Sequence, residues 1–172
     1  GEGLATHAEF NAVPRNLVVH VPDAVGLDVA SSSAIGAIAL QSVRQAGLEL
    51  GESVAVIGLG LLGQFALQLA RANGCRVVGV DLDPAKCALA VRHGAEAASS
   101  PEGDQALLNT LRMTSGLGVD AVLVTTSTSS NQPIELAARL VRERGRVVCV
   151  GNTQIELDWR TWFGKEIDFR FS

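Results

Sequence analysis

The chain has 172 residues, of which 47% are hydrophobic and 19% are charged, a balance typical of a globular domain with a sizeable core. Its net charge of −4 provides no basic surface for a polyanion, so we do not expect nucleic acid as a partner. No apolar run approaches the ~20 residues that a membrane-spanning helix needs, and the N-terminus has no basic segment followed by an apolar one. We therefore expect a cytoplasmic protein without a membrane partner.

Residues 1–25 differ in pattern from the rest of the chain. Residues 8–14 and 16–22 are typical of two short extended segments, punctuated by Pro14, Pro22 and Asp23. Because they are too few to form a core, we expect either an arm on the main domain or the remnant of another domain whose beginning is missing. The predicted boundary leaves residues 26–172 as the main domain.

After this arm, a helical stretch over 28–47 leads into strands that alternate with helices. The predicted strands are residues 54–57, 76–80, 95–99, 119–125, 146–150 and 167–171, and the predicted helices between them are residues 61–72, 84–93, 102–113 and 133–142. This alternation predicts right-handed crossovers and an α/β fold, a doubly wound parallel sheet of six strands in the order 3-2-1-4-5-6 with a short N-terminal arm. Ligands of such Rossmann sheets bind outside the carboxyl ends of the strands, between strands 1 and 4.

Three glycines mark the step from the first strand to the first helix. The segment reads Gly58-Leu59-Gly60-Leu61-Leu62-Gly63 and follows an apolar run directly. In a dinucleotide site, the first glycine permits a tight turn, the second leaves room for a pyrophosphate, and the third allows close contact between helix and strand. The free N–H groups and the positive end of the helix dipole would then face the pyrophosphate.

An acidic residue closes the second predicted strand, at the distance from the glycines that a dinucleotide site requires. This residue is Asp81, whose carboxylate could accept hydrogen bonds from the adenosine ribose hydroxyls. It would repel a 2′-phosphate, and Leu82 and Asp83 after it provide no arginine to bind one, so NAD is favoured over NADP. Lys86, one turn into the next helix, could reach the same ribose. The alternative for Asp81 is a simple cap of the next turn.

The ends of strands four and five should frame the other half of the cofactor. Strand four runs into Thr125, Thr126 and Ser127, in a loop rich in hydroxyl groups. Strand five ends at Val150, Gly151 and Asn152, where a small residue would let a ring lie against the backbone. Ser130 or Asn131 could instead serve as the cap of helix four, and turn chemistry alone could account for Gly151 and Asn152.

Catalytic and metal-binding patterns are missing from the sequence, so its catalytic residues stay unknown. His93 lies at a helix end, while His7 and His20 have no acidic or cysteine partner in suitable spacing, and there is no tyrosine for a Tyr/Lys proton relay. The three cysteines, Cys75, Cys87 and Cys149, lack CxxC spacing, so we expect buried structural residues and neither a disulfide nor a metal site.

Taken together, these motifs resemble those of the medium-chain dehydrogenase/reductase superfamily, the zinc-type alcohol, polyol and threonine dehydrogenases. The resemblance covers nearly the whole chain and rests on the segments 6–23, 50–63, 80–86, 92–95, 116–120 and 145–151. It implies that Asp81 binds the adenosine ribose, that Lys86 assists, and that Leu62 lies against the nicotinamide half. It also implies a catalytic domain, mostly N-terminal to this segment, that carries zinc ligands and the substrate pocket. The arm is similar to the last segment of that domain, so the resemblance implies that residues 1–25 are a remnant of it.

Zinc is possible in such a parent protein, although no ligands are evident here. Near Ser33 the family often has a zinc-bound cysteine or glutamate, and this sequence has Ser31, Ser32 and Ser33 instead. We therefore expect an NAD-binding domain of an alcohol dehydrogenase-like oxidoreductase, which transfers hydride between an alcohol or carbonyl substrate and nicotinamide. By itself the segment should bind without turnover. Strand six, at an open edge, could pair with its copy in a homodimer.

Two other functions also fit parts of the pattern. A regulatory nucleotide-binding module of the kind that gates potassium transport combines similar glycines and an acidic residue, but it would not need the arm at residues 1–25. A methyltransferase that uses S-adenosylmethionine also tolerates an acidic residue after strand two, but such sites have a looser glycine pattern.

Overall fold

A computed structural model describes residues 8–172, which belong to two compact units, residues 1–33 and 34–172. In the first unit, the described residues form a turn of 3-10 helix, η1 (Arg15–Leu17), and a short helix, α1 (Leu27–Ala30). Residues 10–14 and 18–22, within the two segments expected to be extended, have no hydrogen-bonded secondary structure, and η1 between them is closed by the hydrogen bond from Leu17 N–H to the Pro14 carbonyl (2.9 Å). His7 lies outside the described residues.

The helix expected over 28–47 is two helices. After α1 the chain makes a turn at Ser31 and Ser32, and α2 (Ser33–Ala46) follows. The two serine hydroxyls donate to the carbonyls of Asp28 (2.6 Å) and Val29 (2.8 Å). Serine side chains that bond nearby backbone groups compete with helix propagation, which accounts for the interruption.

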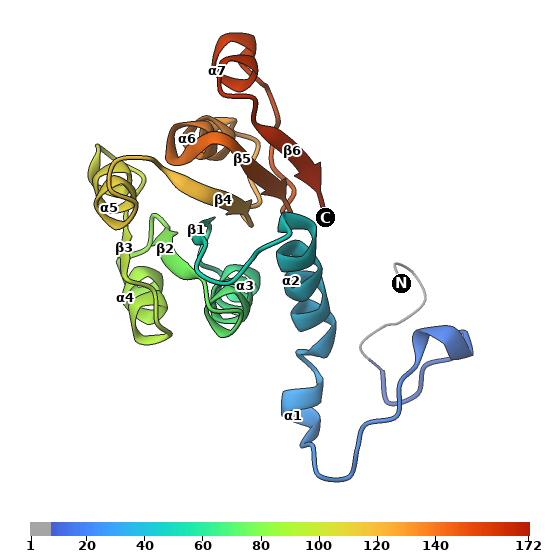
Figure 1. The fold of residues 1–172 in the computed structure, drawn as a ribbon. Helices are drawn as coiled ribbons and strands as arrows, with labels where there is room; N and C mark the ends of the chain where they lie inside the picture. The colour runs from blue at the N-terminus through green and yellow to red at the C-terminus, as the bar shows by residue number, and fades with distance from the viewer. Residues whose placement is uncertain (1–7) are drawn as a thin grey trace. The chain divides into compact units, whose positions relative to one another are not determined.

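The second unit contains the sheet that the sequence predicts. Its strands are β1 (Ser53–Ile57), β2 (Arg76–Val80), β3 (Ala97–Ser99), β4 (Val119–Val124), β5 (Val141–Cys149) and β6 (Asp168–Phe171). All neighbouring pairs are parallel, in the order β3-β2-β1-β4-β5-β6, which confirms the expected doubly wound α/β fold (Figure 1).

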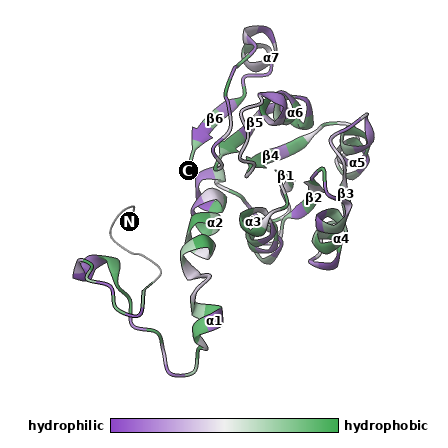
Figure 2. Ribbon diagram, turned by 180° about the vertical axis from the view of Figure 1, so that it is seen from behind, coloured by the Kyte–Doolittle hydropathy of each residue, from purple (hydrophilic) through white to green (hydrophobic). Residues whose placement is uncertain are grey.

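Helices cover both faces of this sheet. The connecting helices are α3 (Leu61–Ala72), α4 (Pro84–Arg92), α5 (Gln105–Met113) and α6 (Gln132–Leu140). Figure 1 shows α5 and α6 on one side of the strands and α3 and α4 on the other. The side chains of β1 alternate accordingly, since Ala55 and Ile57 belong to the core cluster beneath α6 while Val54 and Val56 belong to the cluster beneath α3. Figure 2 shows hydrophobic colouring along the central β4 and mixed colouring on the edge strand β6.

The structure differs from the sequence prediction in two features near the C-terminus. Helix α6 ends at Leu140 rather than Arg142, and β5 already pairs with β4 at Val141 before an irregular segment with a positive φ of 55° at Arg144. A short helix, α7 (Trp159–Gly164), is also present, with the Asp158 carboxylate accepting a hydrogen bond from Thr161 N–H (2.9 Å). The other predicted elements of residues 53–172 differ by no more than three residues at either end.

Two arginines fix the end of α2 against the edge of the sheet. Arg146 on β5 donates to the Gly47 carbonyl (2.9 Å), and Arg170 on β6 donates to the Gln45 carbonyl (2.6 Å). Carbonyls in the last turn of a helix have no partner within the helix, so these guanidinium groups satisfy them. No helix among residues 8–172 is both long and apolar enough to cross a membrane.

Candidate functional site

The glycine turn joins β1 to α3 with very little space between them. Gly58 has φ of +93°, a backbone conformation that residues with a side chain rarely adopt. A Cβ atom at Gly63 would lie 1.9 Å from the Gly58 carbonyl oxygen, so only glycine allows α3 to start this close to the strand. A Cβ atom at Gly60, in contrast, would meet nothing within 4 Å. The first and third glycines thus build the turn, and the second borders open space.

Thr125, the first residue after β4, holds this turn from the neighbouring strand. Its hydroxyl lies 2.5 Å from the Gly58 carbonyl oxygen and 3.1 Å from that of Ile57, and its backbone N–H donates to Ile57 as well (2.8 Å). The Gly58 peptide is therefore fixed by a side chain that follows a different strand. A threonine hydroxyl can give its single proton to either carbonyl.

Asp81 connects the glycine turn to the end of β2. One carboxylate oxygen accepts a hydrogen bond from Leu59 N–H (2.7 Å), and the other accepts one from Asp83 N–H (2.9 Å). The Lys86 ammonium lies 3.7 Å from the second oxygen. The Asp81 side chain is only 12% exposed. It is thus an ordered anion with a cation beside it.

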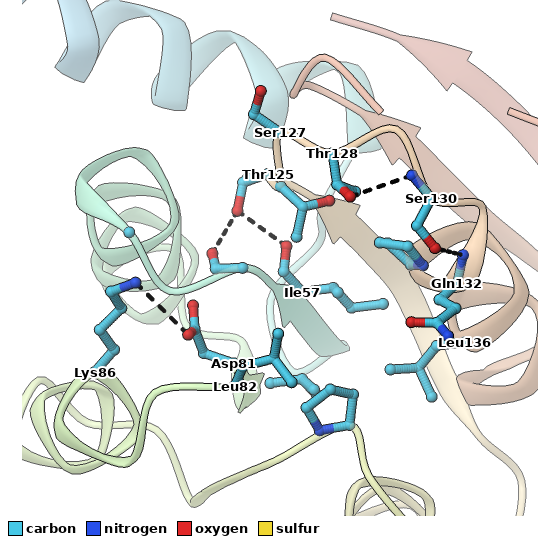
Figure 3. A pocket seen from close by; sticks show the side chains of 16 residues that line it. Ile57, Asp81, Leu82, Lys86, Thr125, Ser127, Thr128, Ser130, Gln132 and Leu136 are labelled. Carbon is cyan, nitrogen blue, oxygen red and sulfur yellow. Dashed lines mark hydrogen bonds and ion pairs between the residues drawn. The ribbon is translucent and has the colours of Figure 1, made fainter. Parts of the chain in front are cut away.

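These groups border a cavity of about 440 Å³ at the carboxyl ends of β1, β2 and β4. Figure 3 shows Asp81 and Lys86 on one side of it, Ser130, Gln132 and Leu136 on the opposite side, and Thr125 between them. The predicted site residues that line it are Gly58, Gly60, Asp81, Leu82, Lys86, Thr125, Thr126 and Ser127. The structure thus brings together the glycine turn, the acidic residue and the loop after β4, at the place where Rossmann folds bind ligands.

The other predicted site residues lie near this cavity without lining it. Leu59 is buried beneath the turn, Gly63 packs against it, and Leu62 packs on the core below α3. Leu61 faces solvent and lines a separate groove between α3 and α4. Val150 N–H and Gly151 N–H both donate to the Val124 carbonyl, and Asn152 borders a shallow polar cavity with Ser127.

The loops after β4 and β5 run side by side. The hydroxyls of Thr126 and Thr153 lie 2.9 Å apart, and Thr153 also donates to the Thr126 carbonyl (2.8 Å). A Cβ atom at Gly151 would lie 1.9 Å from that same carbonyl oxygen, so the loops touch closely. Ser130 contributes to the start of α6, because its hydroxyl oxygen accepts a hydrogen bond from Gln132 N–H (3.2 Å). Asn131 occupies the cap position without capping through its side chain.

The sequence did not predict half of the residues that line the cavity. Those residues are Ile57, Val80, Pro101, Thr128, Ser130, Gln132, Pro133 and Leu136. Proline after β3 and a helix N-terminus beginning Gln132-Pro133 were visible signals, since loops at the carboxyl edge of a parallel sheet converge on one site. Which of their residues face the cavity depends on the packing of α6.

The described residues contain no group of three or more His, Cys, Asp or Glu side chains that could hold a metal ion. Within the same range, His20 is exposed, and His93 has its Nδ1 atom 3.1 Å from the Gln64 amide oxygen. All three cysteines are free and buried, as predicted, and burial raises the pKa of each thiol, which suppresses the reactive thiolate. We therefore assign no metal ligand and no nucleophile to this part of the chain.

Comparison with known proteins identifies the family. Residues 62–172 match the family described as zinc-binding dehydrogenase. The chain belongs to this family. An alcohol dehydrogenase of Geobacillus stearothermophilus is 34% identical over 146 residues, which are 84% of this chain and 42% of the relative. Alcohol dehydrogenase notN of Aspergillus sp. (strain MF297-2) is 36% identical over 127 residues, 72% of this chain and 35% of the relative.

Solved structures of dehydrogenases share the fold. Alcohol dehydrogenase TADH from Thermus sp. ATN1 superposes with a TM-score of 0.76 at 26% identity, over 88% of this chain and 45% of that one. A zinc-binding dehydrogenase from Sinorhizobium meliloti 1021, bound to NADP, gives a TM-score of 0.80 at 25% identity, over 93% of this chain and 48% of that one. The chain thus spans less than half the length of these relatives. The resemblance to the medium-chain dehydrogenase superfamily is confirmed, and these relatives favour it over a potassium-transport module.

Proposed function

We propose that this zinc-binding dehydrogenase segment binds a nicotinamide dinucleotide in the 440 Å³ cavity. The observation that carries the proposal is the Asp81 carboxylate, which lies at the edge of the cavity between the glycine turn and Lys86. A ribose has two neighbouring hydroxyls that can donate to one carboxylate, and a cation beside it can hold their oxygens. The bound NADP in the Sinorhizobium meliloti relative supports the same class of ligand.

The residues around the cavity suit the successive parts of a dinucleotide. The open space above Gly60, at the N-terminus of the twelve-residue α3, suits a pyrophosphate, which the free N–H groups and the helix dipole attract. Val80, Pro101 and Leu136 offer an apolar wall for a flat base. The loops at 125–127 and 150–152 are proposed to hold the nicotinamide half, with Leu62 beneath it.

We expect NAD to be preferred over NADP. Asp81 would lie close to a 2′-phosphate and would repel it, because the carboxylate is mostly shielded from solvent and little screened. Lys86 is the cation among the lining residues, and it already lies 3.7 Å from Asp81 and 4.0 Å from Asp83. An extra phosphate would therefore compete with two carboxylates for one ammonium group.

In the whole protein, this segment would serve an alcohol dehydrogenase-like oxidoreductase that moves hydride between an alcohol or carbonyl and the cofactor. A bound nicotinamide supplies the hydride chemistry, and this chain's residues bind and orient it. The 172-residue chain should bind the cofactor without turnover, since more than half of each relative's length lies outside the match.

Two further expectations stay predictions: that two β6 edges pair in a homodimer, and that the protein is cytoplasmic. Size-exclusion chromatography with light scattering tests the first.

Isothermal titration calorimetry on the 172-residue chain tests the proposal. NADH should bind saturably at one site, NADPH more weakly, and S-adenosylmethionine not at all. ADP-ribose, which lacks the nicotinamide, should retain much of the affinity because it keeps the pyrophosphate and the adenosine ribose. Absence of NADH binding by a chain that circular dichroism shows to be folded would overturn the proposal.

A further inference from the structure

Gln64 is a buried polar side chain that the cofactor site itself does not use. It follows Gly63 in the first turn of α3 and is only 6% exposed. A buried amide is costly unless its polar atoms are paired, so its partners show what it is built for. Those partners belong to the glycine turn and to both ends of α4.

The amide group of Gln64 makes three hydrogen bonds. Its nitrogen donates to the Leu59 carbonyl (3.2 Å) and to the Lys86 carbonyl (3.1 Å), and its oxygen lies 3.1 Å from His93 Nδ1. The two carbonyls accept only, which fixes the amide orientation. The oxygen therefore faces His93, and Nδ1 of that imidazole must carry the proton. His93 in turn holds the Gln64 amide against the two carbonyls.

Both backbone polar groups of Leu59 are thereby held by side chains. Asp81 accepts from Leu59 N–H at 2.7 Å, and Gln64 donates to the Leu59 carbonyl. The same amide reaches the backbone of Lys86, whose ammonium lies beside Asp81. Gln64 thus connects the glycine turn to the backbone of Lys86, the one cation that lines the described cavity. Its two hydrogen bonds set the distance between the turn and this part of α4.

We propose that Gln64, oriented by His93, is a positioning residue that presets the glycine turn and Lys86 for the dinucleotide. The inference rests on the proposed function. An apolar residue at position 64 would fill the same volume but would leave the turn and α4 free to shift against each other. The cofactor would then have to order them on binding, which lowers affinity.

A double-mutant cycle measured by NADH titration tests this inference. Gln64→Leu should weaken NADH and ADP-ribose by the same factor, about 10-fold, because it breaks a buried hydrogen-bond network on the adenosine side of the site. In a Lys86→Met background the same substitution should cost only about 3-fold, since one of the groups it positions is gone. Gln105→Leu, the same change at an exposed position of α5 away from the cavity, is the matched control and should leave both affinities unchanged.

His93 provides a second arm in case Gln64→Leu does not fold. His93→Leu leaves both carbonyl bonds of Gln64 possible and should weaken NADH about 3-fold, while His93→Asn, whose Nδ2 can replace Nδ1 as donor, should restore the affinity. ¹⁵N NMR of neutral His93 should show Nδ1 protonated. If Gln64→Leu weakens NADH binding by the same factor in the wild-type and Lys86→Met backgrounds, the inference is overturned. Normal NADH binding by both Gln64→Leu and His93→Leu would also overturn it, and either result would leave the proposed function standing. A folded wild-type chain that does not bind NADH would overturn the proposed function and this inference with it.

Discussion

The Asp81 carboxylate accepts a 2.7 Å hydrogen bond from the backbone N–H of Leu59, in the middle of the glycine turn. The side chain proposed to bind the cofactor ribose is therefore also part of the turn that would bind the pyrophosphate. The two halves of the proposed site are thus one hydrogen-bonded unit, in which the carboxylate that holds the turn is also the one proposed to select the cofactor.

The first prediction concerns cofactor selectivity. Asp81→Asn removes the negative charge but keeps an oxygen that can accept from Leu59 N–H. We expect NADH affinity to fall about 10-fold, because a charge-assisted hydrogen bond is lost, and the preference for NADH over NADPH to shrink. Titration calorimetry with both cofactors measures these changes. Asp104→Asn, at an exposed acid paired with Arg139 (3.0 Å), is the control and should change neither. An unchanged NADH/NADPH ratio in Asp81→Asn would contradict the assignment.

The second prediction concerns the close approach of α3 to β1. In Gly63→Ala the new methyl group would lie 1.9 Å from the Gly58 carbonyl oxygen, so the turn or the helix must move. We expect a loss of about 1–3 kcal/mol in the free energy of unfolding, the usual range for overpacking. Gly36→Ala is the matched control, because a methyl group there meets nothing within 4 Å. Helix propensity should make it more stable by about 0.5–1 kcal/mol. Urea denaturation distinguishes the two, and equal stabilities would refute the packing argument.

The third prediction concerns acid stability. Burial by itself would raise the pKa of Asp120, but hydrogen bonds from Ser53 N–H (2.8 Å), its hydroxyl (2.7 Å) and Arg142 (2.7 Å) outweigh it and lower the pKa below the ordinary 3.8. A lowered folded pKa stabilises the protein above the pKa of the unfolded chain, and this contribution is lost as pH falls through the folded value.

Asp120→Asn should therefore cost about 1–3 kcal/mol at pH 7, the range for hydrogen bonds to a charged group. The difference between wild type and variant should begin to narrow below pH about 4, where the carboxyl of the unfolded wild-type chain becomes protonated while that of the folded chain stays ionised. Urea denaturation at pH 7, 5 and 3.5 measures the trend, with Asp104→Asn as the control at an exposed acid. A difference that stays constant with pH would rule out the linkage.

The fourth prediction compares two arginines of β5. The Arg146 side chain, 17% exposed, bonds the Glu52 carboxylate and the Gly47 carbonyl, whereas that of Arg144, 77% exposed, pairs with Glu166. Arg146→Met should lower the free energy of unfolding by about 3 kcal/mol, because it removes the guanidinium that pairs with the shielded Glu52 carboxylate and with the Gly47 carbonyl. Arg144→Met should cost less than about 1 kcal/mol, as for other surface ion pairs. Thermal and urea unfolding measure both, and similar losses would show that α2 does not depend on Arg146.

Much of the fold could be predicted because its signals are local. Strands and helices of residues 53–140 alternate with clear apolar periodicity, and the handedness of crossovers restricts the strand orders, among which the glycine turn favours the observed one. The break after Ala30 and the helix at 159–164 escaped prediction for a related reason. Each is short, and each is decided by single side-chain bonds, from Ser31 and Ser32 and to Asp158, rather than by a periodic pattern.

By itself, the sequence determined the glycine turn and the acidic residue at the end of β2, because these depend on spacing along consecutive residues. It also determined the order of the sheet, because strands alternate with helices along the whole domain. Only the tertiary structure decided that Pro101 and Leu136 wall the cavity, that Thr126 meets Thr153, and that Gln64 joins Leu59 to Lys86. These contacts join residues from different elements, and they form only where packed helices bring side chains within hydrogen-bonding distance.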